Sequence, residues 1–574
     1  MRLRSSFLLA VTILASALSP ALAQRDMAVI ELLEMQYNLD DAVRFLPEGP
    51  NGPHSTLSIV PDDHVTIQAA IDAAPASGHT ILIRAGTYVE ETLIDASRFD
   101  DLTIEGECGR LPVLDGSNGR CISISNPNDD TLTVKIRNLH LTNGTHGIDV
   151  RGSSSDIDAV VTTLHASRLQ FTDLLYGIEA GNRTGDFRCN GDWGAVNADL
   201  LDQPITRVYI DRCTFLACFY DAINLWRANG AIVSNIILHS GGEGIHTTDL
   251  FDAVIANNFM MECDDIQCHL QYAGAVEIKN NIIVGGDESF TNYQSDGIVV
   301  AGAKRAHLPV GPEVHIDNNI FYGSQGAGVH VVGTSIVIKH DPCKEVLIPS
   351  RVRLRNNVFL GNAFGSEHYA LHIVDARHNL LDDWVEHTLF HDNNGRHYDP
   401  TIDILGEGNI FDQSPLFSAL PHRDSLLAMA TAEEIRDIIM GFRPHNASPL
   451  IDAGNPGGRF TDRSYLAGGG PTNDIGVFGG PQAVPSPLHV GSRSTPCLSM
   501  LVDWSGARVY FDDPLFVEPG GDPLAASTRA RMFGREVNLH WVAQGIDMRW
   551  VQPTALLSTH ELGNHRLKVI TVPE

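Results

Sequence analysis

The chain has 574 residues, of which 43% are hydrophobic and 52 are glycine, and its 70 acidic against 40 basic side chains give a formal net charge of -30 at pH 7. This composition excludes a disordered chain and predicts a large core with many turns, spread over two or three domains. Because such a charge repels phosphate and anionic lipid, we expect no nucleic-acid partner and a preference for cations or neutral ligands.

The N-terminus has the features of a secretory signal peptide. Basic residues precede the apolar run Phe7–Leu18, and Ala21–Ala23 forms a small-residue cleavage site. We therefore predict that residues 1–23 are removed and that the protein is secreted, with an extracellular, periplasmic or cell-surface location. No stretch reaches the roughly 18 apolar residues that a membrane span needs, so none is expected, and we expect a monomer.

A short motif recurs along the middle of the chain. Asparagine followed by two apolar residues occurs at Asn235, Asn258 and Asn281, which lie 23 residues apart each time. Looser copies begin at Asn138, Asn319, Asn357 and Asn409. This period suits one coil of a β-solenoid, with three short strands and three turns, and Val, Ile and Phe favour strands. Asparagine at one turn of each coil is expected to stack into a side-chain ladder and tolerates a left-handed backbone.

Motifs at both ends of the repeats carry a family resemblance. Thr66–Ala74 is typical of a short helix, followed by a strand and turn at Thr80–Tyr88, and Ser448–Gly454 and Asp474–Gly480 form two glycine-rich motifs near the exit. This arrangement resembles the pectin-lyase-like superfamily of right-handed parallel β-helices over about 56–481. The resemblance implies the fold, with a short helix over the first coil, but no single activity, because the superfamily includes lyases, hydrolases, epimerases, phage spikes and non-enzymes.

We predict an all-β protein in which a right-handed parallel β-helix lies between an N-terminal helical cap and a small C-terminal β-sandwich domain, at 56–481, 24–55 and 482–574 respectively. Helical apolar spacing over Ala28–Phe45 suggests the cap, and Thr431–Gly441 has the start and stop signals of a short helix. Alternating segments such as Leu498–Val502 and Arg566–Ile570 suggest the strands of the last domain.

Four of the nine cysteines have a repeated spacing. Cys213 and Cys218, like Cys263 and Cys268, are separated by four residues. The spacing fits either a metal site or buried thiols in the solenoid core, and we favour buried thiols.

Acidic residues recur at one position of the repeat. When the coils are aligned on a small residue followed by Ile or Val, four consecutive coils have an acid before it: Asp221, Glu243, Asp264 and Asp296. We place this column at a turn that faces solvent. Because neighbouring strands are about 4.8 Å apart, the carboxylates repel unless something offsets the cost. Bound Ca²⁺ is one offset, acid–base chemistry with one protonated carboxyl is another, and chance with turn preference is the alternative.

Other side chains are expected on the same face. The alignment places Asn224, His246 and Gln267 outward, and long insertions at 182–206 and 301–312 interrupt the period there. We predict substrate contacts from two tryptophans, two histidines and an arginine: Trp193, Trp226, His246, His269 and Arg305. For each of them, ordinary packing or a solvated loop is the alternative.

These residues suggest an enzyme that degrades an extracellular polysaccharide. Within the resemblance, only Asp264-Asp265 matches a diagnostic element of the polygalacturonase-type hydrolases, and the other strings are absent. We place a Ca²⁺-assisted polysaccharide lyase first, with the metal on the four-acid column and catalytic candidates Arg227, Lys304, Asp264 and Asp265. A glycoside hydrolase using paired carboxylates and a non-catalytic surface or adhesion protein are the alternatives.

Overall fold

The computed structural model describes the chain in segments. These are 43–45, 57–107, 111–126, 131–151, 162–181, 206–285, 295–303, 313–332, 334–338, 344–348, 351–365, 369–374, 384–400, 404–420, 432–457, 460, 462, 472–480, 483 and the strands between 500 and 570. They fall into two units, Ser58–Gly106 with Leu111–Val490, and Met1–Leu57 with Glu107–Arg110 and Gly491–Glu574. The helices among the described residues are too short or too polar to cross a membrane.

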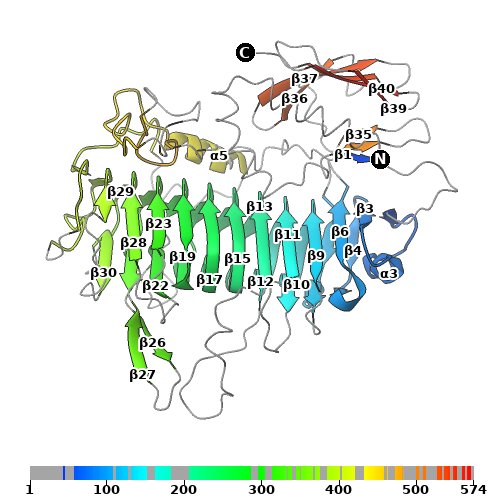
Figure 1. Ribbon diagram of the computed structural model, residues 1–574, viewed down its shortest axis with the longest axis horizontal. Coiled ribbons are helices and arrows are strands. Elements are labelled where there is room, and N and C mark those ends of the chain that lie inside the picture. Colours follow the sequence, from blue (N-terminus) through cyan, green and yellow to red (C-terminus); the bar gives the residue numbers. More distant parts are fainter. Residues whose placement is uncertain are drawn as a thin grey trace. The chain divides into compact units, whose positions relative to one another are not determined.

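In the first unit, the chain winds through three stacks of parallel strands, here called stacks A, B and C (Figure 1). Stack A follows β2 (Leu57–Val60) and contains β3 (His79–Ile83), β6 (Asp101–Gly106), β9 (Leu132–Arg137), β11 (Thr162–Ser167), β13 (Thr206–Asp211), the second parts of β15 (Ile223–Val233) and β17 (Ile245–Ala256), β20 (Val276–Lys279), β23 (Glu313–Asp317), β28 (Arg351–Arg355) and β31 (Val385–Glu386).

Stack B contains β4 (Thr87–Val89), β7 (Val113–Asp115), the first parts of β10 (His140–Arg151) and β12 (Gln170–Ala180), β14 (Thr214–Leu216), β16 (Ile236–Leu238), β18 (Phe259–Met261), β21 (Ile282–Val284), β24 (Ile320–Tyr322), β29 (Val358–Leu360), β32 (Leu389–His391) and β33 (Ile410–Phe411). Stack C contains β5 (Thr92–Asp95), β8 (Arg120–Ser125), the second parts of β10 and β12, the first parts of β15 and β17, β19 (Ile266–Ala273), β22 (Asp296–Ala303), β25 (Val329–Val332) and β30 (Leu371–Val374). This pairing confirms the predicted parallel β-helix.

A short helix covers the first coil, as the sequence predicts. Helix α3 (Ile67–Ala73) begins at Thr66, whose side chain accepts a hydrogen bond from the Ala69 N–H at 3.0 Å, and its Ile67 and Ile71 are buried in the core. A 3-10 turn, η2 (Ala96–Arg98), follows β5. The helical cap expected in 24–55 lies mostly outside the described residues. Within it, Val43–Phe45 is not helical, because these residues form the strand β1, which pairs with β34 (Met500–Val502).

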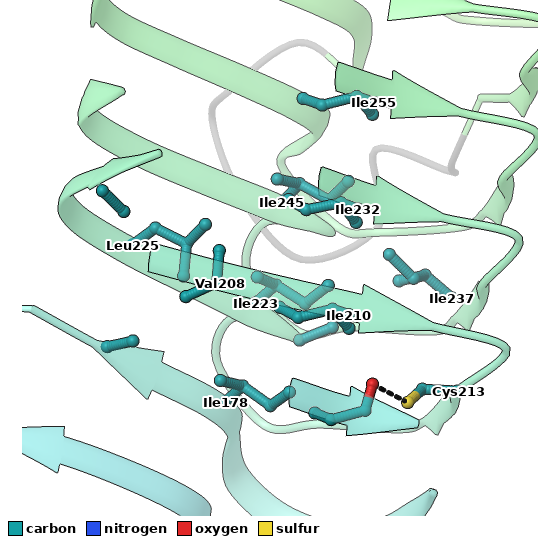
Figure 2. Packing of buried hydrophobic residues seen from close by; sticks show 14 of the residues in the cluster. Ile178, Val208, Ile210, Cys213, Ile223, Leu225, Ile232, Ile237, Ile245 and Ile255 are labelled. Carbon is teal, nitrogen blue, oxygen red and sulfur yellow. Dashed lines mark hydrogen bonds between the residues drawn. The ribbon is translucent and has the colours of Figure 1, made fainter. Parts of the chain in front are cut away.

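Isoleucine and valine side chains fill the interior of the coil. Figure 2 shows Ile178, Ile223 and Ile245 of stack C packed near Ile210 and Ile232 of stack A, all of them buried. Larger rings stack along the axis, and Phe321, Phe359 and Phe390 follow one another at centroid distances of 4.8 and 4.9 Å. Identical positions on successive coils thus pack directly against each other.

The four cysteines with the repeated spacing are buried free thiols, as the favoured interpretation of that spacing predicts. Cys213, Cys218, Cys263 and Cys268 are each at most 1% exposed and unpaired. Burial raises the pKa of Cys218 to about 12, so its thiol stays neutral. In Figure 2 the thiol of Cys213 donates to the Ala166 carbonyl at 3.5 Å.

The repeated asparagines form a continuous ladder at the turn from stack A to stack B. The side-chain amide of each donates to the carbonyl oxygen of the next, at 2.9 to 3.1 Å, through Asn235, Asn258, Asn281, Asn319 and Asn357. All five are at most 1% exposed. The left-handed backbone lies one residue earlier, at Ser234, Asn257, Asn280, Asn318 and Asn356. The ladder therefore satisfies buried polar groups that the turn would otherwise leave unpaired.

The residues after the last coil, here called the closing segment, contain a helix and the two glycine-rich motifs Ser448–Gly454 and Asp474–Gly480, here called the closing motifs. This segment covers the outer face of stack B. Ile435, Ile438 and Phe442, in and just after helix α5 (Ala432–Gly441), pack on outward side chains of stack B such as Phe259, together with Val477 of the second closing motif. The predicted helix at 431–441 is confirmed. Left-handed asparagines of the coil bind the closing motif directly, because the Asn280 amide donates to the carbonyls of Val477 and Gly479, and the Asn318 amide to those of Asp474 and Gly476.

Among the described residues, three further sheets lie outside the stacks. In the first unit, β26 (Thr334–Ile338) and β27 (Lys344–Ile348) form an antiparallel hairpin. In the second unit, β35 (Val509–Phe511) completes a sheet with β1 and β34, and a five-stranded sheet contains β36 (Ser527–Met532), β37 (Arg535–Val542), β38 (Asp547–Val551), β40 (His565–Ile570) and β39 (Thr559–Leu562), in that order. Strands are thus present in 498–502 and 566–570, while the sandwich packing of this domain stays a prediction.

We expect Asn281→Ala to lower the free energy of unfolding by roughly 3 kcal/mol, because the ladder would lose a member and leave buried groups unpaired. Its side chain donates to the Ile255 and Asn319 oxygens and accepts from the backbone and the amide of Asn258. Urea unfolding of the variant measures the loss. Gln170→Ala, which removes an exposed amide from a strand, is the control, and an equal effect of both substitutions would contradict a structural role for the ladder.

Candidate functional site

The outer face of stack C has two recurring positions per coil. One position lies where each coil turns into stack C, two residues before the inward side chain that pairs across the coils, and is here called the turn position: His146, Tyr176, Asp221, Glu243, Ile266, Asp296, Ala327 and Tyr369. The other lies three residues later, here called the strand position: Asp149, Glu179, Asn224, His246, His269, Val299, His330 and His372. The strand register thus aligns polar side chains along the helix axis.

Turn-position side chains reach the strand position of the next coil. Asp221 Oδ2 lies 3.5 Å from His246 Nδ1, and Glu243 Oε1 lies 2.8 Å from His269 Nδ1. Two further pairs repeat the pattern, Asp296 with His330 at 2.9 Å and His146 with Glu179 at 2.7 Å. An acid on one coil is therefore matched by a histidine on its neighbour. This is a third way of offsetting the repulsion between stacked acids, beside the two that the sequence suggests.

The observed register corrects the alignment made from the sequence at one coil. Ile245 pairs with Cys268 and not with Ile266, so the motif alignment is two residues out of register on this coil. Asp264 consequently lies in that turn and outside the acidic column, whose member on this coil is Ile266. The repeat of 23 residues between Asn235, Asn258 and Asn281 points to Cys268, because it lies 23 residues after Ile245.

Two outward assignments change with this register. His269 lies beside His246, with the rings stacked at 5.3 Å and nearly parallel at 6°. Gln267 is buried and binds the backbone of Cys263, with its amide oxygen accepting from the N–H at 3.1 Å and its amide nitrogen donating to the carbonyl at 3.0 Å. The column is also less open than expected, because Glu243 and Asp296 are 8% and 5% exposed.

The Glu243 carboxylate is the centre of the largest group of these side chains. Its two oxygens lie 3.0 and 2.8 Å from the Nδ1 atoms of His246 and His269. Asp221 lies beside it, with one oxygen accepting from the Glu243 backbone N–H and the other from the Asn224 amide, both at 3.0 Å. We call these five residues the Glu243 cluster.

The environment moves the pKa values of the cluster in opposite directions. Burial alone would raise the pKa of Glu243, but hydrogen bonds from His246 and His269 and their charge lower it to about 2. Burial would likewise lower the pKa of His246, but hydrogen bonds to Asp221 and Glu243 and their charge raise it to about 10. An ionised carboxylate and an imidazolium therefore coexist over a wide pH range.

Asp265 is a second kind of carboxyl beside this cluster. It lies half-buried in the turn before β19, where its backbone N–H donates to the Gly242 carbonyl at 3.3 Å. Burial, followed by the negative charge of Glu243 and smaller contributions from Asp296 and Asp221, raises its pKa to about 6. The pKa of Asp264 is also raised, by burial and by the charge of Glu262.

Of the other predicted site residues, Trp226 lies next to the Glu243 cluster and Arg227 lies further along the same strand. Trp226 is half-buried next to the cluster, with its ring centroid 6.1 Å from that of His246. Arg227 lies at the far end of the same strand segment, six residues or about 20 Å of extended chain after Asp221. The predicted Trp193, Lys304 and Arg305 lie outside the described residues.

The predicted calcium ligands do not fit a calcium site as they are arranged. Glu243 and Asp296 accept hydrogen bonds from imidazole nitrogens, and Asp221 accepts from an amide and a backbone N–H. The fourth ligand, Asp264, lies outside the column. Calcium takes about six to eight oxygen ligands, whereas these carboxylates face nitrogen donors, one of them the imidazolium of His246, whose positive charge opposes a cation.

A second polar group, two coils earlier, has no counterpart among the predicted site residues. The imidazole of His146 contacts Glu179, and Asp149 binds Arg120 at 2.5 Å and Arg151 at 2.7 Å. Its signal in the sequence is the same pair of positions, with histidine and acid exchanged between the coils.

Comparisons with known proteins agree with the fold. The family model described as a right handed beta helix region matches residues 120–340 and 202–396. No curated protein matches the sequence. Similar solved structures include pectate lyase Pel9A, at 14% identity and a TM-score of 0.36 over 76% of this chain and 96% of that one. Another is the A-module of Azotobacter vinelandii mannuronan C-5 epimerase AlgE4, at 16% identity and a TM-score of 0.32 over 62% and 94%.

A third is the catalytic domain of a GH87 alpha-1,3-glucanase, at 10% identity and a TM-score of 0.29 over 58% of this chain and 68% of that one. At such identities and TM-scores these likenesses say nothing of the activity of this chain. With the strand pairing, the family model makes the first unit a right-handed parallel β-helix.

We expect Glu243→Gln to lower the pKa of His246 from about 10 towards its ordinary 6.5, because the substitution removes an anionic partner. NMR titration of the histidine ring signals measures the change. Retention of the high pKa in the variant would show that Asp221 alone holds the proton.

The same substitution should cost stability mainly between pH 4.5 and 6.5. The lowered pKa of Glu243 stabilises the fold above 4.5 and the effect is lost as pH falls towards 2, whereas the raised pKa of His246 stabilises it below 6.5 and the effect is lost as pH rises towards 10. Urea unfolding across this range measures the difference from the unsubstituted protein. Glu277→Gln, which removes a half-exposed partner of Lys279, is the control and should give a nearly flat difference.

Proposed function

We propose that this right-handed parallel β-helix protein is a secreted carbohydrate-active enzyme that hydrolyses glycosidic bonds in an extracellular polysaccharide. The observation that supports this best is the pair of neighbouring carboxyls with separated pKa values, about 6 for Asp265 and about 2 for Glu243. Two carboxyls whose environments separate their pKa values in this way suit acid–base catalysis, because one holds a proton while the other is ionised.

In this proposal Asp265 is the general acid. It is half-buried and therefore within reach of a substrate, and below about pH 6 its carboxyl holds the proton that the leaving glycosidic oxygen needs. The ionised Glu243, with Asp221 beside it, provides negative charge that stabilises the positively charged transition state of the sugar ring. His246 and His269 fix the Glu243 carboxylate. Glu243 and Asp221 are the candidates for the base or nucleophile.

A neutral glycan suits this site better than a polyuronate. β-Elimination requires a cation at the uronate carboxylate and a base at the adjacent carbon, and the lyase hypothesis assigned these roles to Ca²⁺ and to Arg227 or Lys304. The carboxylates are bonded to nitrogen donors, Arg227 is about a strand length away, and the imidazolium of His246 is matched by Glu243. The formal charge of -30 further opposes a polyanion.

We expect Asp265→Asn to reduce kcat at least about 100-fold on a neutral polysaccharide, because the general acid is lost. Release of reducing ends from β-glucan, α-glucan, mannan and xylan measures it, and activity of the unsubstituted enzyme should fall as pH rises through about 6. Chelator should have no effect. Glu277→Gln is the control on another face of the coil.

The lyase alternative gives a different result in the same assay. Absorbance near 235 nm that rises on pectate or alginate only with Ca²⁺, and disappears in Asp264→Asn, would replace the hydrolase by the lyase. Absence of product on every substrate would favour the non-catalytic surface or adhesion role.

Export of the protein is a separate expectation. Expression with its full N-terminus in a secreting host should yield a protein that begins at Gln24, because cleavage is expected after Ala23. N-terminal sequencing of the exported protein tests this, and an intact Met1 would contradict the signal-peptide prediction.

A further inference from the structure

Two large aromatic side chains are exposed in the turn that leads into the Glu243 cluster. Phe219 and Tyr220 are 64% and 45% exposed and immediately precede Asp221. Removing such rings from water would be favourable, yet about half or more of each ring's residue surface stays exposed among the described residues. Their position beside the acids makes them unlike an isolated surface hydrophobic residue.

The two rings belong to a row that follows the helix axis. Tyr220 stacks on Tyr176 at 5.2 Å, and Tyr176 stacks on His146 at 5.1 Å. Phe219 meets Tyr220 edge-on at 5.0 Å and 87°. The two stacking distances match the coil repeat of about 4.8 Å, so Tyr220 is supported by the rings of the two preceding coils, and Phe219 lies against Tyr220 on the same coil.

The backbone under the rings is fixed on both sides. The N–H groups of Phe219 and Tyr220 donate to the carbonyls of Leu174 and Leu175 on the preceding coil, both at 2.8 Å. On the following coil, the Gly242 N–H donates to the Tyr220 carbonyl at 3.2 Å. The backbone that carries the rings is thus fixed before any ligand arrives, which reduces the entropy lost on binding.

The next turn along the axis has no side chains at the equivalent place. Gly241 and Gly242 stack on Phe219 and Tyr220, and a Cβ atom on Gly241 would lie 2.4 Å from the Phe219 carbonyl oxygen. The turn after that contains Asp265, whose N–H donates to the Gly242 carbonyl. Rings, glycines and acid therefore follow one another over two coil spacings, about 10 Å.

We propose that Phe219 and Tyr220 form a sugar-binding subsite that stacks on a ring of a neutral polysaccharide, over Gly241 and Gly242, and presents the adjoining glycosidic bond to Asp265. The faces of a pyranose ring carry C–H groups that suit an aromatic surface, and the neighbouring acids disfavour an anionic sugar. The polysaccharide would run along the helix axis, across successive coils. This inference rests on the proposed function and names its substrate class and orientation.

Binding is tested separately from catalysis, in the Asp265→Asn background. Migration of the protein through native gels that contain β-glucan, α-glucan, mannan or xylan measures affinity without turnover. We expect retardation in at least one gel and a loss of affinity of about tenfold when Phe219→Ala is added, with a similar or larger loss for Tyr220→Ala. Phe219 is the sharper test, because its exposure makes a folding defect on truncation small.

Phe364→Ala is the matched control. Phe364 is 51% exposed in the equivalent turn between stacks B and C, several coils further along. Its truncation should leave migration unchanged. Equal migration of Phe219→Ala and its Asp265→Asn parent, an equal loss in Phe364→Ala, or free migration of the parent in every gel overturns the subsite.

Turnover of the proteins that retain Asp265 separates the two proposals. If the subsite is correct, Phe219→Ala lowers kcat/KM about tenfold with kcat at saturation nearly unchanged, because the acid is intact. Loss of gel retardation in Phe219→Ala without any hydrolysis by the unsubstituted protein supports the subsite and removes the hydrolase. Hydrolysis that depends on Asp265 but is indifferent to Phe219 removes the subsite and leaves the hydrolase.

Discussion

The spacing of about 4.8 Å between successive coils governs this molecule inside and outside. Every side chain lies close to its equivalents on the two neighbouring coils, so a residue type must tolerate its own kind as a neighbour. Phenylalanine does so by ring stacking, as Phe321 and Phe359 show at 4.8 Å. Asparagine does so because it has both a donor and an acceptor, and the chain from Asn235 to Asn357 uses both.

Carboxylates repel their own kind on the neighbouring coil, and the outer face of stack C shows how the fold accommodates them. Glu243 is tolerated beside Asp221 because His246 lies between the two carboxylates, and His269 takes its second oxygen. The arrangement needs no bound cation, since the positive charge comes from a side chain that the next coil delivers. It also keeps Glu243 ionised, so a proton donor has to be a carboxyl outside these acid–histidine pairs.

Much of this fold can be predicted from the sequence, because features that repeat in space also repeat in the chain. The period between Asn258 and Asn281 predicts the coil, and the turn signals around 431–441 predict helix α5. The site is harder, because a short motif can match at the wrong register. Asp264-Asp265-Ile266 fits the motif two residues too early, and the observed register moves Asp264 out of the column and His269 beside His246. Nearness in sequence is also a weak guide to a shared site, since Arg227 follows Asp221 along an extended strand segment.

The turn that misleads the alignment also provides the chemistry proposed for the site. There Asp265 takes the place that Gly242 has on the preceding coil, near Glu243 but without the imidazole hydrogen bonds that lower the pKa of Glu243, and burial together with the charge of Glu243 raises its pKa to about 6. Acids that are paired with histidines on the next coil keep a fixed ionisation. The proton donor of this site therefore has to come from a position outside these acid–histidine pairs. The same reasoning applies to the preceding turns, where Phe219 remains exposed because the next coil offers Gly241 and no side chain to cover it.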